Sequence, residues 1–204
     1  LNKQLAIGGT YLLKNSSVLD LRFSWSKIDA GKRPPLTGGP SMFDQYGITG
    51  LPTDPIVTGG LTTQTIGGLS QLGRQSTNPQ YQNPTNFDLR LNYTFLVGRH
   101  SIKTGYEYLR IGTDVQDTNP LMSLDTYTGQ YSRPVGASSN NLYNLSDFMF
   151  GLRSQYELAN LTVAEMQQRF HFGYIQDDFK VNQKLTLNLG MRYEFGTPYW
   201  EKNN

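Results

Sequence analysis

The side chains best suited to acid–base or metal chemistry are two adjacent carboxylates, Asp177 and Asp178, and the two histidines, His100 and His171. A carboxylate pair can act as general acid and base, and carboxylates with imidazoles can hold a metal ion. The two histidines lie far apart in the sequence, and the chain has no cysteine to complete a metal-binding motif. Asp177 and Asp178 come just before a turn, where solvated charges are ordinary. We therefore expect no catalytic residue, no metal site and no enzymatic activity.

Phosphate and nucleic-acid chemistry are not indicated either. The segment GGLSQLG, residues 67–73, is glycine-rich but matches no phosphate-binding or dinucleotide-binding motif. The 18 basic and 16 acidic residues leave a net charge of +2 and no polybasic patch. The sequence thus predicts no cofactor and no nucleic-acid partner.

A third set of polar residues occurs at alternate positions of strand-like segments. In residues 185–194, Leu, Met and Tyr at every odd position alternate with polar residues or Gly at every even one. A period of two places the two sets on opposite faces of a β-strand. With this segment included, the same pattern predicts six strands, near residues 4–13, 18–27, 86–97, 100–111, 168–179 and 185–195. The charged members of the polar face are Asp20, Arg22, Arg90, Lys103, Glu107, Arg192 and Glu194.

Two tight turns predict how neighbouring strands pair. A two-residue turn at Gly98 and Arg99 places opposite each other residues whose numbers add to 197, so that Arg90 faces Glu107. A turn around Asn182 and Gln183 gives a sum of 365, which pairs Tyr174 with Met191, Phe172 with Tyr193 and His171 with Glu194. In this second hairpin Gln176 and Asp178 fall on the apolar side, which indicates either a strand that has left the apolar layer or a bulge.

The connections between these strands alternate between short and very long. Residues 28–85 contain ten glycines and seven prolines without a sustained period, and residues 113–166 form a second long loop. Within the second loop, one helical face with Asn141 as its cap is predicted by Leu142, Leu145, Met149 and Leu152.

Short turns at one end and long loops at the other are typical of outer-membrane barrels. No run of about 18 apolar residues predicts a transmembrane helix. Aromatic residues near the strand ends, such as Trp25, Tyr93 and Tyr108, fit interfacial girdles. The predicted fold is all-β, an antiparallel up-and-down transmembrane β-barrel. Residues 1–204 would form about six strands of one larger barrel domain, with long extracellular loops and the charged set facing the lumen. There those residues would form a ladder of salt bridges or contact a plug or ligand.

Particular segments also resemble a known family. YIQDDFKVNQKLTLNLGMRYEF, residues 174–195, is similar to a strand-turn-strand signature of TonB-dependent outer-membrane receptors, nearest to the Oar-like group with a carboxypeptidase-regulatory-like domain. HSIKTGYEY, residues 100–108, and LSDFMFGL, residues 145–152, resemble segments of the same group. The resemblance implies a barrel of about 22 strands closed around an N-terminal plug. Because no plug or TonB-contacting segment is recognised, we expect an internal piece of a longer receptor.

The resemblance implies a receptor in the bacterial outer membrane that takes up a scarce external ligand with energy passed through TonB. Its partners would be membrane lipid, a TonB-type protein acting through the missing N-terminal region, and a ligand captured by loops 28–85 and 113–166. Siderophore, vitamin, oligosaccharide and peptide all remain open as ligands. The alternatives are a passive porin or a surface adhesin on a similar barrel, and a soluble β-rich binding domain or secreted enzyme domain whose apolar face would meet a protein core.

Overall fold

The computed structural model describes residues 1–14 and 16–203, and these form two compact units. The first, here called the sheet unit, contains Leu1–Ala30, Gln82–Val115 and Ala164–Asn204. The second, the loop unit, contains Gly31–Tyr81 and Gln116–Val163. The chain therefore leaves the sheet twice to build a separate folded body from its two long connections.

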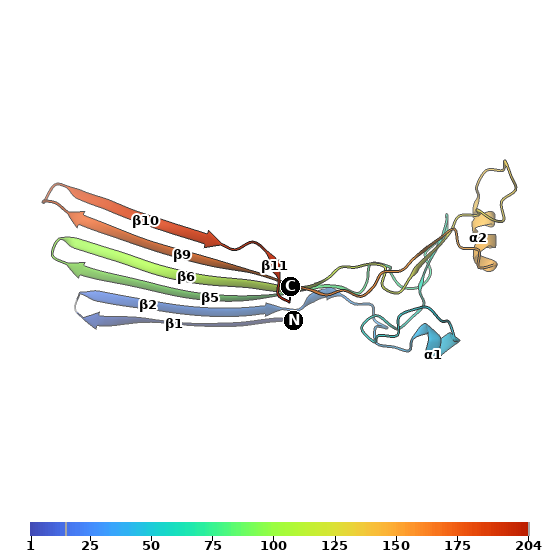
Figure 1. Ribbon diagram of the computed structural model, residues 1–204, viewed down its shortest axis with the longest axis horizontal. Helices are drawn as coiled ribbons and strands as arrows, with labels where there is room; N and C mark the ends of the chain where they lie inside the picture. The colour runs from blue at the N-terminus through green and yellow to red at the C-terminus, as the bar shows by residue number, and fades with distance from the viewer. Residues whose placement is uncertain (15, 204) are drawn as a thin grey trace. The chain divides into compact units, whose positions relative to one another are not determined.

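The sheet unit is built from six long antiparallel strands in sequence order (Figure 1). Three short turns lie at the same end of the sheet, and the two long connections leave from the other end. This is the predicted up-and-down meander, and all six predicted strands are present. The strands are β1 (Asn2–Lys14), β2 (Ser17–Ile28), β5 (Gln80–Val97), β6 (His100–Gln116), β9 (Ala164–Lys180) and β10 (Thr186–Gly196).

Three of these strands are longer than the alternation predicted. β5 begins at Gln80 rather than near residue 86, β6 continues to Gln116, and β9 begins at Ala164. Two short strands extend the sheet: β3 (Ala30–Lys32) pairs with β5, and β11 (Trp200–Glu201) pairs with β9. The extra residues lie where the chain leaves for the loop unit, and backbone pairing there does not need the apolar alternation that the prediction used.

The predicted contact of the first hairpin is present. The turn is the two residues Gly98 and Arg99, with Gly98 at a φ of 58°. A positive φ there suits glycine and matches the twist of the strands. Arg90 and Glu107, which the sum of 197 placed opposite each other, form an ion pair at 3.2 Å. The turn residues thus predicted a cross-strand contact correctly.

The predicted register of the second hairpin is wrong by one residue. Tyr174 pairs with Arg192 and Phe172 with Glu194, so opposed residues add to 366 instead of 365. The cause is the turn, because five residues separate β9 from β10 and the Asn182 side chain accepts hydrogen bonds from the backbone of Lys184 and Leu185. A shift of one residue moves every side chain of a strand to the other face. Phe172, Tyr174, Gln176 and Asp178 therefore share the polar face, which removes the mismatch at Gln176 and Asp178 without a bulge.

The loop unit contains regular structure where the sequence predicted long irregular loops. Its sheet has three strands, β4 (Thr63–Ile66), β7 (Leu124–Tyr127) and β8 (Gln155–Glu157), with β4 and β7 parallel. It also holds helix α1 (Met42–Tyr46), which Ser41 and Asp44 close with a capping box, and helix α2 (Asn141–Met149). The short helix predicted in the second loop is confirmed, but its cap is Asn140 rather than Asn141, since the Asn140 side chain accepts from Leu142 and Tyr143.

Buried apolar side chains are confined to the loop unit. Among the described residues the fully buried hydrophobic set is Met42, Val57, Ile66, Leu121, Met122 and Tyr127. In the sheet unit the apolar face is open, and Leu189, Met191 and Tyr193 of β10 are 60–72% exposed. The sheet therefore has an apolar face but no protein core to cover it.

Candidate functional site

All seven predicted charged residues lie on the same face of the sheet, here called the polar face. The strand pairings place Arg22 opposite Arg90 and Asp20 opposite Asn92. Farther along the sheet, Glu107 lies opposite Phe172, which in turn pairs with Glu194. Period-two alternation on each strand carries Lys103 and Arg192 onto this same face. The seven predicted residues therefore share one face, and Asp88 and Asp178 lie on it as well.

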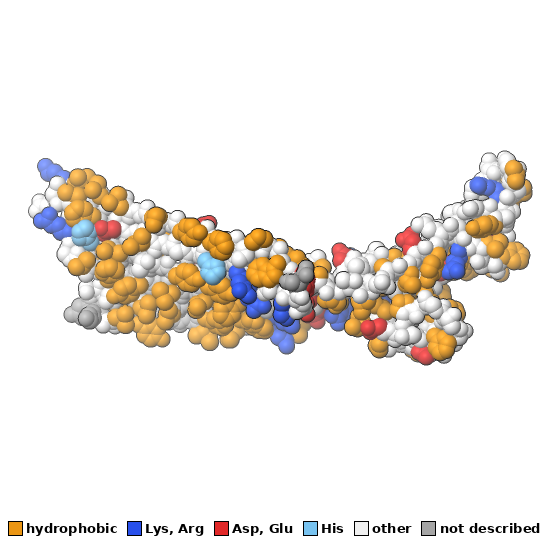
Figure 2. Space-filling model, in the orientation of Figure 1, with side chains coloured by type: hydrophobic (Ala, Val, Ile, Leu, Met, Phe, Trp, Pro, Cys, Tyr) orange, Lys and Arg blue, Asp and Glu red, His pale blue; other side chains and the backbone are white. Residues whose placement is uncertain are grey.

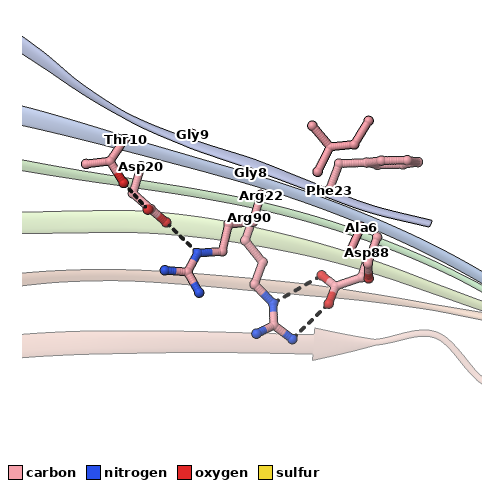
Figure 3. A pocket seen from close by; sticks show the side chains of 11 residues that line it. Ala6, Gly8, Gly9, Thr10, Asp20, Arg22, Phe23, Asp88 and Arg90 are labelled. Atoms are coloured by element: carbon pink, nitrogen blue, oxygen red, sulfur yellow. Dashed lines mark hydrogen bonds and ion pairs between the residues drawn. The ribbon is translucent and has the colours of Figure 1, made fainter. Parts of the chain in front are cut away.

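The polar face is organised as ion pairs along and across the strands. Arg22 and Arg90 are opposed like charges, which by themselves destabilise a sheet. Asp20 lies 3.0 Å from Arg22, and Asp88 lies 2.8 Å from Arg90 (Figure 3). These pairs border a hollow of about 630 Å³ over β1, β2 and β5. Positive and negative side chains therefore alternate along this part of the polar face.

Two further ion pairs extend the ladder toward the other strands. Lys103 lies 3.2 Å from Asp178, and Arg192 is bonded to Glu194 on its own strand. Each predicted charged residue therefore has a partner of opposite sign on the same face. Exposed pairs of this kind contribute little to stability.

The aromatic members of the polar face were missed. Tyr174 donates a hydrogen bond to Asn92 at 3.0 Å, and its ring lies over Gly105, where an added Cβ would approach a ring carbon to 2.4 Å. Arg192 lies over the Phe172 ring, 5.6 Å from its centre. The wrong register of the second hairpin hid these residues. Gln176 and Asp178 occupy the same alternate positions of β9 as Phe172 and Tyr174. Their polar side chains were the signal that could have revealed the true face of these aromatic residues.

Asp177 and Asp178 do not form a carboxylate pair. Asp177 contacts His100 on the apolar face at 2.6 Å, whereas Asp178 contacts Lys103 on the polar face. Neighbours in a strand point to opposite faces, so the two side chains diverge. Across residues 1–14 and 16–203 no three His, Asp or Glu side chains gather closely enough to hold a metal ion.

The opposite face of the sheet carries a continuous aromatic belt. Phe23 contacts Phe87, Phe87 contacts Tyr108, Tyr108 contacts His171 and His171 contacts Phe195, with ring centres 5.1–6.2 Å apart. The belt crosses β2, β5, β6, β9 and β10 near the end of the sheet that leads to the long connections. Figure 2 shows apolar side chains covering this face on either side of the two histidines.

A second aromatic group lies on the same face near the short turns. Tyr93 stacks on Phe95 at 5.4 Å, and His100 stacks on Phe179 at 4.3 Å. Residues between the two groups are mainly aliphatic or aromatic, including Leu91 and Met191, with Thr104 and Gly173 among them. An apolar band with aromatic residues at both borders is the surface that outer-membrane barrels turn to lipid.

In the loop unit, one polar network joins the two long connections. Gln64 donates to Asp125 at 2.8 Å and accepts from Tyr127 at 2.9 Å, and Arg153 reaches Asp125 at 3.0 Å. The hydrogen bond that Arg153 donates to Asp125 raises the pKa of Arg153, and burial raises the pKa of Tyr127. Because Gln64 belongs to the first connection and the others to the second, the network fixes the loops to each other.

Helix α2 packs with its polar side inward. Asn144 and Asp147 are buried, and Asp147 accepts hydrogen bonds from the backbone of Tyr131 and Ser132 at 3.2 and 2.9 Å. Burial alone would raise the pKa of Asp147, but hydrogen bonding by the Ser132 side chain and by the backbone of residues 130–132 outweighs burial and lowers that pKa. The apolar residues that predicted the helix lie outward, and Leu142 and Met149 are 75% and 73% exposed.

An apolar hollow of about 500 Å³ lies within the first long connection. Pro34, Pro35, Leu36 and Leu61 form much of its wall, and Arg74 contributes a buried guanidinium. That group donates to the carbonyl of Gly59 at 3.0 Å and to that of Val57, and burial lowers its pKa. The first of the two predicted ligand-binding loops therefore contains a concave site. The charged group in its wall, the Arg74 guanidinium, is already bound to backbone carbonyls.

Together, the alternating faces, the aromatic borders and the absence of a core define the wall of a membrane barrel. No helix among the described residues is long and apolar enough to cross a membrane. Residues 1–204 match the family described as outer membrane beta barrel domain, and the chain belongs to it. It is therefore a bacterial outer-membrane protein, and its main sheet, which is not closed, is consistent with part of a barrel. No curated protein and no solved structure matches the chain significantly.

Proposed function

We propose that the chain is part of a receptor that captures a scarce external ligand and passes it through a plugged barrel with energy from a TonB-type protein. The observation that carries the proposal is the loop unit, which is a folded body with its own core, a network joining both connections and a concave site. A preformed binding surface suits capture of a rare ligand, because the binding residues are ordered before the ligand arrives.

The polar face supports the same function. In a barrel the face opposite the lipid borders the lumen. The ion pairs of Arg22, Arg90 and Lys103, together with Phe172 and Tyr174, would line that space. Paired charges and aromatic rings can be exchanged for contacts with a plug or a moving ligand at small cost, since exposed ion pairs contribute little. The likeness of residues 174–195 to TonB-dependent receptors adds to this proposal. We propose no catalytic activity, because the two candidate carboxylates are each engaged elsewhere, Asp177 with His100 and Asp178 with Lys103.

Conductance of the full-length protein separates this function from a passive porin without knowledge of the ligand. Reconstituted in planar bilayers in potassium chloride, a plugged receptor should pass almost no current until urea unfolds its plug. A porin would conduct steadily from the first insertion. Steady conductance by the untreated protein would contradict energy-coupled uptake and favour a porin.

Exposed apolar residues on α2 favour a second candidate, a surface adhesin. Leu142, Met149 and Phe150 are each more than 70% exposed, and large apolar side chains exposed together can mark an interaction surface. The triple change to Ser of these residues should reduce attachment of expressing cells to a host-cell layer if adhesion is the function. Unchanged attachment would remove this candidate and leave the receptor proposal untouched.

A further inference from the structure

The apolar face changes character immediately beyond the aromatic belt. On β6, Tyr108 of the belt is followed on the same face by Arg110, and on β9 His171 is preceded by Arg169. On β2, Trp25 is followed by Lys27, which pairs with Lys3. Figure 2 shows Lys and Arg side chains gathered beside the belt on the face that carries both histidines. We call Lys3, Lys27, Arg110 and Arg169 the basic row.

The two arginines of this row are placed against each other without an acidic partner. Arg110 and Arg169 are directly opposed in the pairing of β6 with β9. Arg110 donates to the Gln167 side chain at 3.3 Å, and Arg169 lies 5.3 Å from the centre of the Trp200 ring. Among the described residues neither guanidinium has a carboxylate within 4.0 Å. Opposed like charges destabilise a sheet, so an anion that bridged them would remove this cost.

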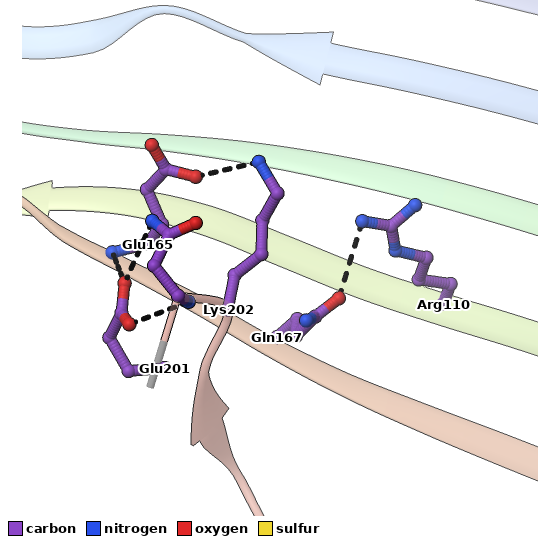
Figure 4. Close-up of polar contacts among 6 residues, drawn as sticks. Arg110, Glu165, Gln167, Glu201 and Lys202 are labelled. Atoms are coloured by element: carbon purple, nitrogen blue, oxygen red, sulfur yellow. Dashed lines mark hydrogen bonds and ion pairs between the residues drawn. The ribbon is translucent and has the colours of Figure 1, made fainter.

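Acidic residues are present on this face only farther from the belt. Asp114 and Glu165 lie four residues beyond Arg110 and Arg169, which is about 13 Å along a strand. Glu165 is bonded to Lys202 at 2.8 Å, as Figure 4 shows. The level next to the belt therefore carries only positive charge.

The space beside Arg110 suits an amphiphilic molecule. A hollow of about 280 Å³ has Trp25 and Phe87 in its wall together with Arg110 and the buried Gln167. Gly112 lies in the same wall, where an added Cβ would meet nothing closer than 3.8 Å. One side of the hollow is thus aromatic and continuous with the lipid-facing band. The other side carries Arg110 nearest the belt, and farther out Asp114 and the ion pair of Glu165 with Lys202.

We propose that the basic row binds the phosphate groups of an anionic lipid of the outer leaflet, whose acyl chains lie against the aromatic belt. Aromatic belts mark the level of lipid headgroups, so charges just beyond a belt are at the depth of phosphates. Arginine binds phosphate through two parallel hydrogen bonds, and a phosphate between Arg110 and Arg169 would satisfy both. The wall of the barrel would then carry a specific lipid site in addition to non-specific contact with acyl chains.

Lipid binding to the full-length protein in neutral detergent micelles tests this site. Native mass spectrometry would measure the apparent Kd for synthetic diphosphoryl lipid A. We expect the double change Arg110→Gln with Arg169→Gln to weaken binding about tenfold or more. The control Arg22→Gln removes a charge from the polar face of the same sheet and should leave the Kd within about twofold. Arg110→Lys with Arg169→Lys keeps the charge and should restore most of the affinity.

Two competitors and a folding control complete the test. Lipid A without phosphates should bind no better to the wild type than to the double variant, and inorganic phosphate at millimolar concentration should not displace diphosphoryl lipid A. Equal affinity of wild type and double variant would overturn the proposal. Displacement by inorganic phosphate would replace it with a free-anion site. Migration of unheated samples as a folded barrel on gels establishes that each variant is folded.

Discussion

The sheet unit and the loop unit solve the burial of apolar residues in opposite ways. In the sheet unit Leu, Met and aromatic side chains lie exposed on one face, whereas in the loop unit Met42, Val57, Leu121 and Met122 are almost completely enclosed. The polar residues follow the reverse pattern, because the loop unit buries Asp125, Asn144 and Asp147 while the charges of the sheet are open. One unit depends on lipid as its apolar solvent, and the other carries its own core.

This difference determines what stabilises each unit. A strand in lipid needs only backbone pairing and an apolar face, so its side chains can vary in size. The loop unit instead depends on close packing and on satisfied buried polar groups. Substitutions should therefore affect the two units through different mechanisms and in different solvents.

The largest expected effect is at Gly59 in the loop unit. Gly59 has a φ of 104°, and an added Cβ would lie 1.8 Å from the carbonyl oxygen of Leu36. Gly59→Ala should destabilise the loop unit by about 4 kcal/mol or more, because the backbone must move. The control Gly50→Ala has a similar φ of 81° but nothing within 4 Å, and should cost about 1 kcal/mol. Hydrogen exchange should show faster exchange in residues 33–79 and an unchanged main sheet. Equal effects of the two changes would show that packing at Gly59 is not limiting.

A charge on the apolar face of β10 should be the next largest effect. Met191 lies between the two aromatic groups and is 72% exposed. Met191→Arg should cost about 2–4 kcal/mol in a bilayer, because the arginine would meet the hydrocarbon. Asn188→Arg places the same side chain on the polar face beside Asp178 and should change stability by less than about 1 kcal/mol. Urea titration of the full-length protein in lipid vesicles measures both. A tolerated Met191→Arg would contradict the assignment of this face to lipid.

The stability of the loop unit should depend on pH through Asp147. Because its folded-state pKa is lowered, ionised Asp147 stabilises the loop unit above its ordinary pKa, and this stability is lost as the pH falls through the lowered value. Hydrogen exchange around Tyr131 and Ser132 should therefore accelerate under strongly acidic conditions. Asp147→Asn should cost about 2 kcal/mol at neutral pH and flatten this pH dependence. An unchanged acid response in the variant would assign the effect to other carboxylates.

The smallest expected effect is loss of a single ion pair on the polar face. Glu107→Gln removes the cross-strand partner of Arg90 but leaves Asp88 at 2.8 Å. Stability in vesicles should fall by less than about 1 kcal/mol, since the arginine keeps a carboxylate and the site is open to water. A loss of several kcal/mol would mean that the polar face is packed against another part of the parent protein.

The sequence by itself determined the strands and most of their faces. Alternation with a period of two depends only on the geometry of a single strand, so the six strands and the common face of the seven charged candidates could be predicted, although Asp178 was assigned to the wrong side. The contact between Arg90 and Glu107 followed from a two-residue turn at Gly98, whose chemistry is local.

Tertiary structure decided the features that depend on partners distant in the sequence. Asn182 organised a longer turn and moved Phe172 and Tyr174 to the polar face. Parallel pairing of β4 with β7 joins segments separated by about 60 residues, which no local pattern encodes. An amphipathic helix pattern identifies which side is apolar but not what the helix meets. The α2 helix therefore turned its polar side inward, because Asp147 found backbone donors in the loop unit and Leu142 found no apolar surface.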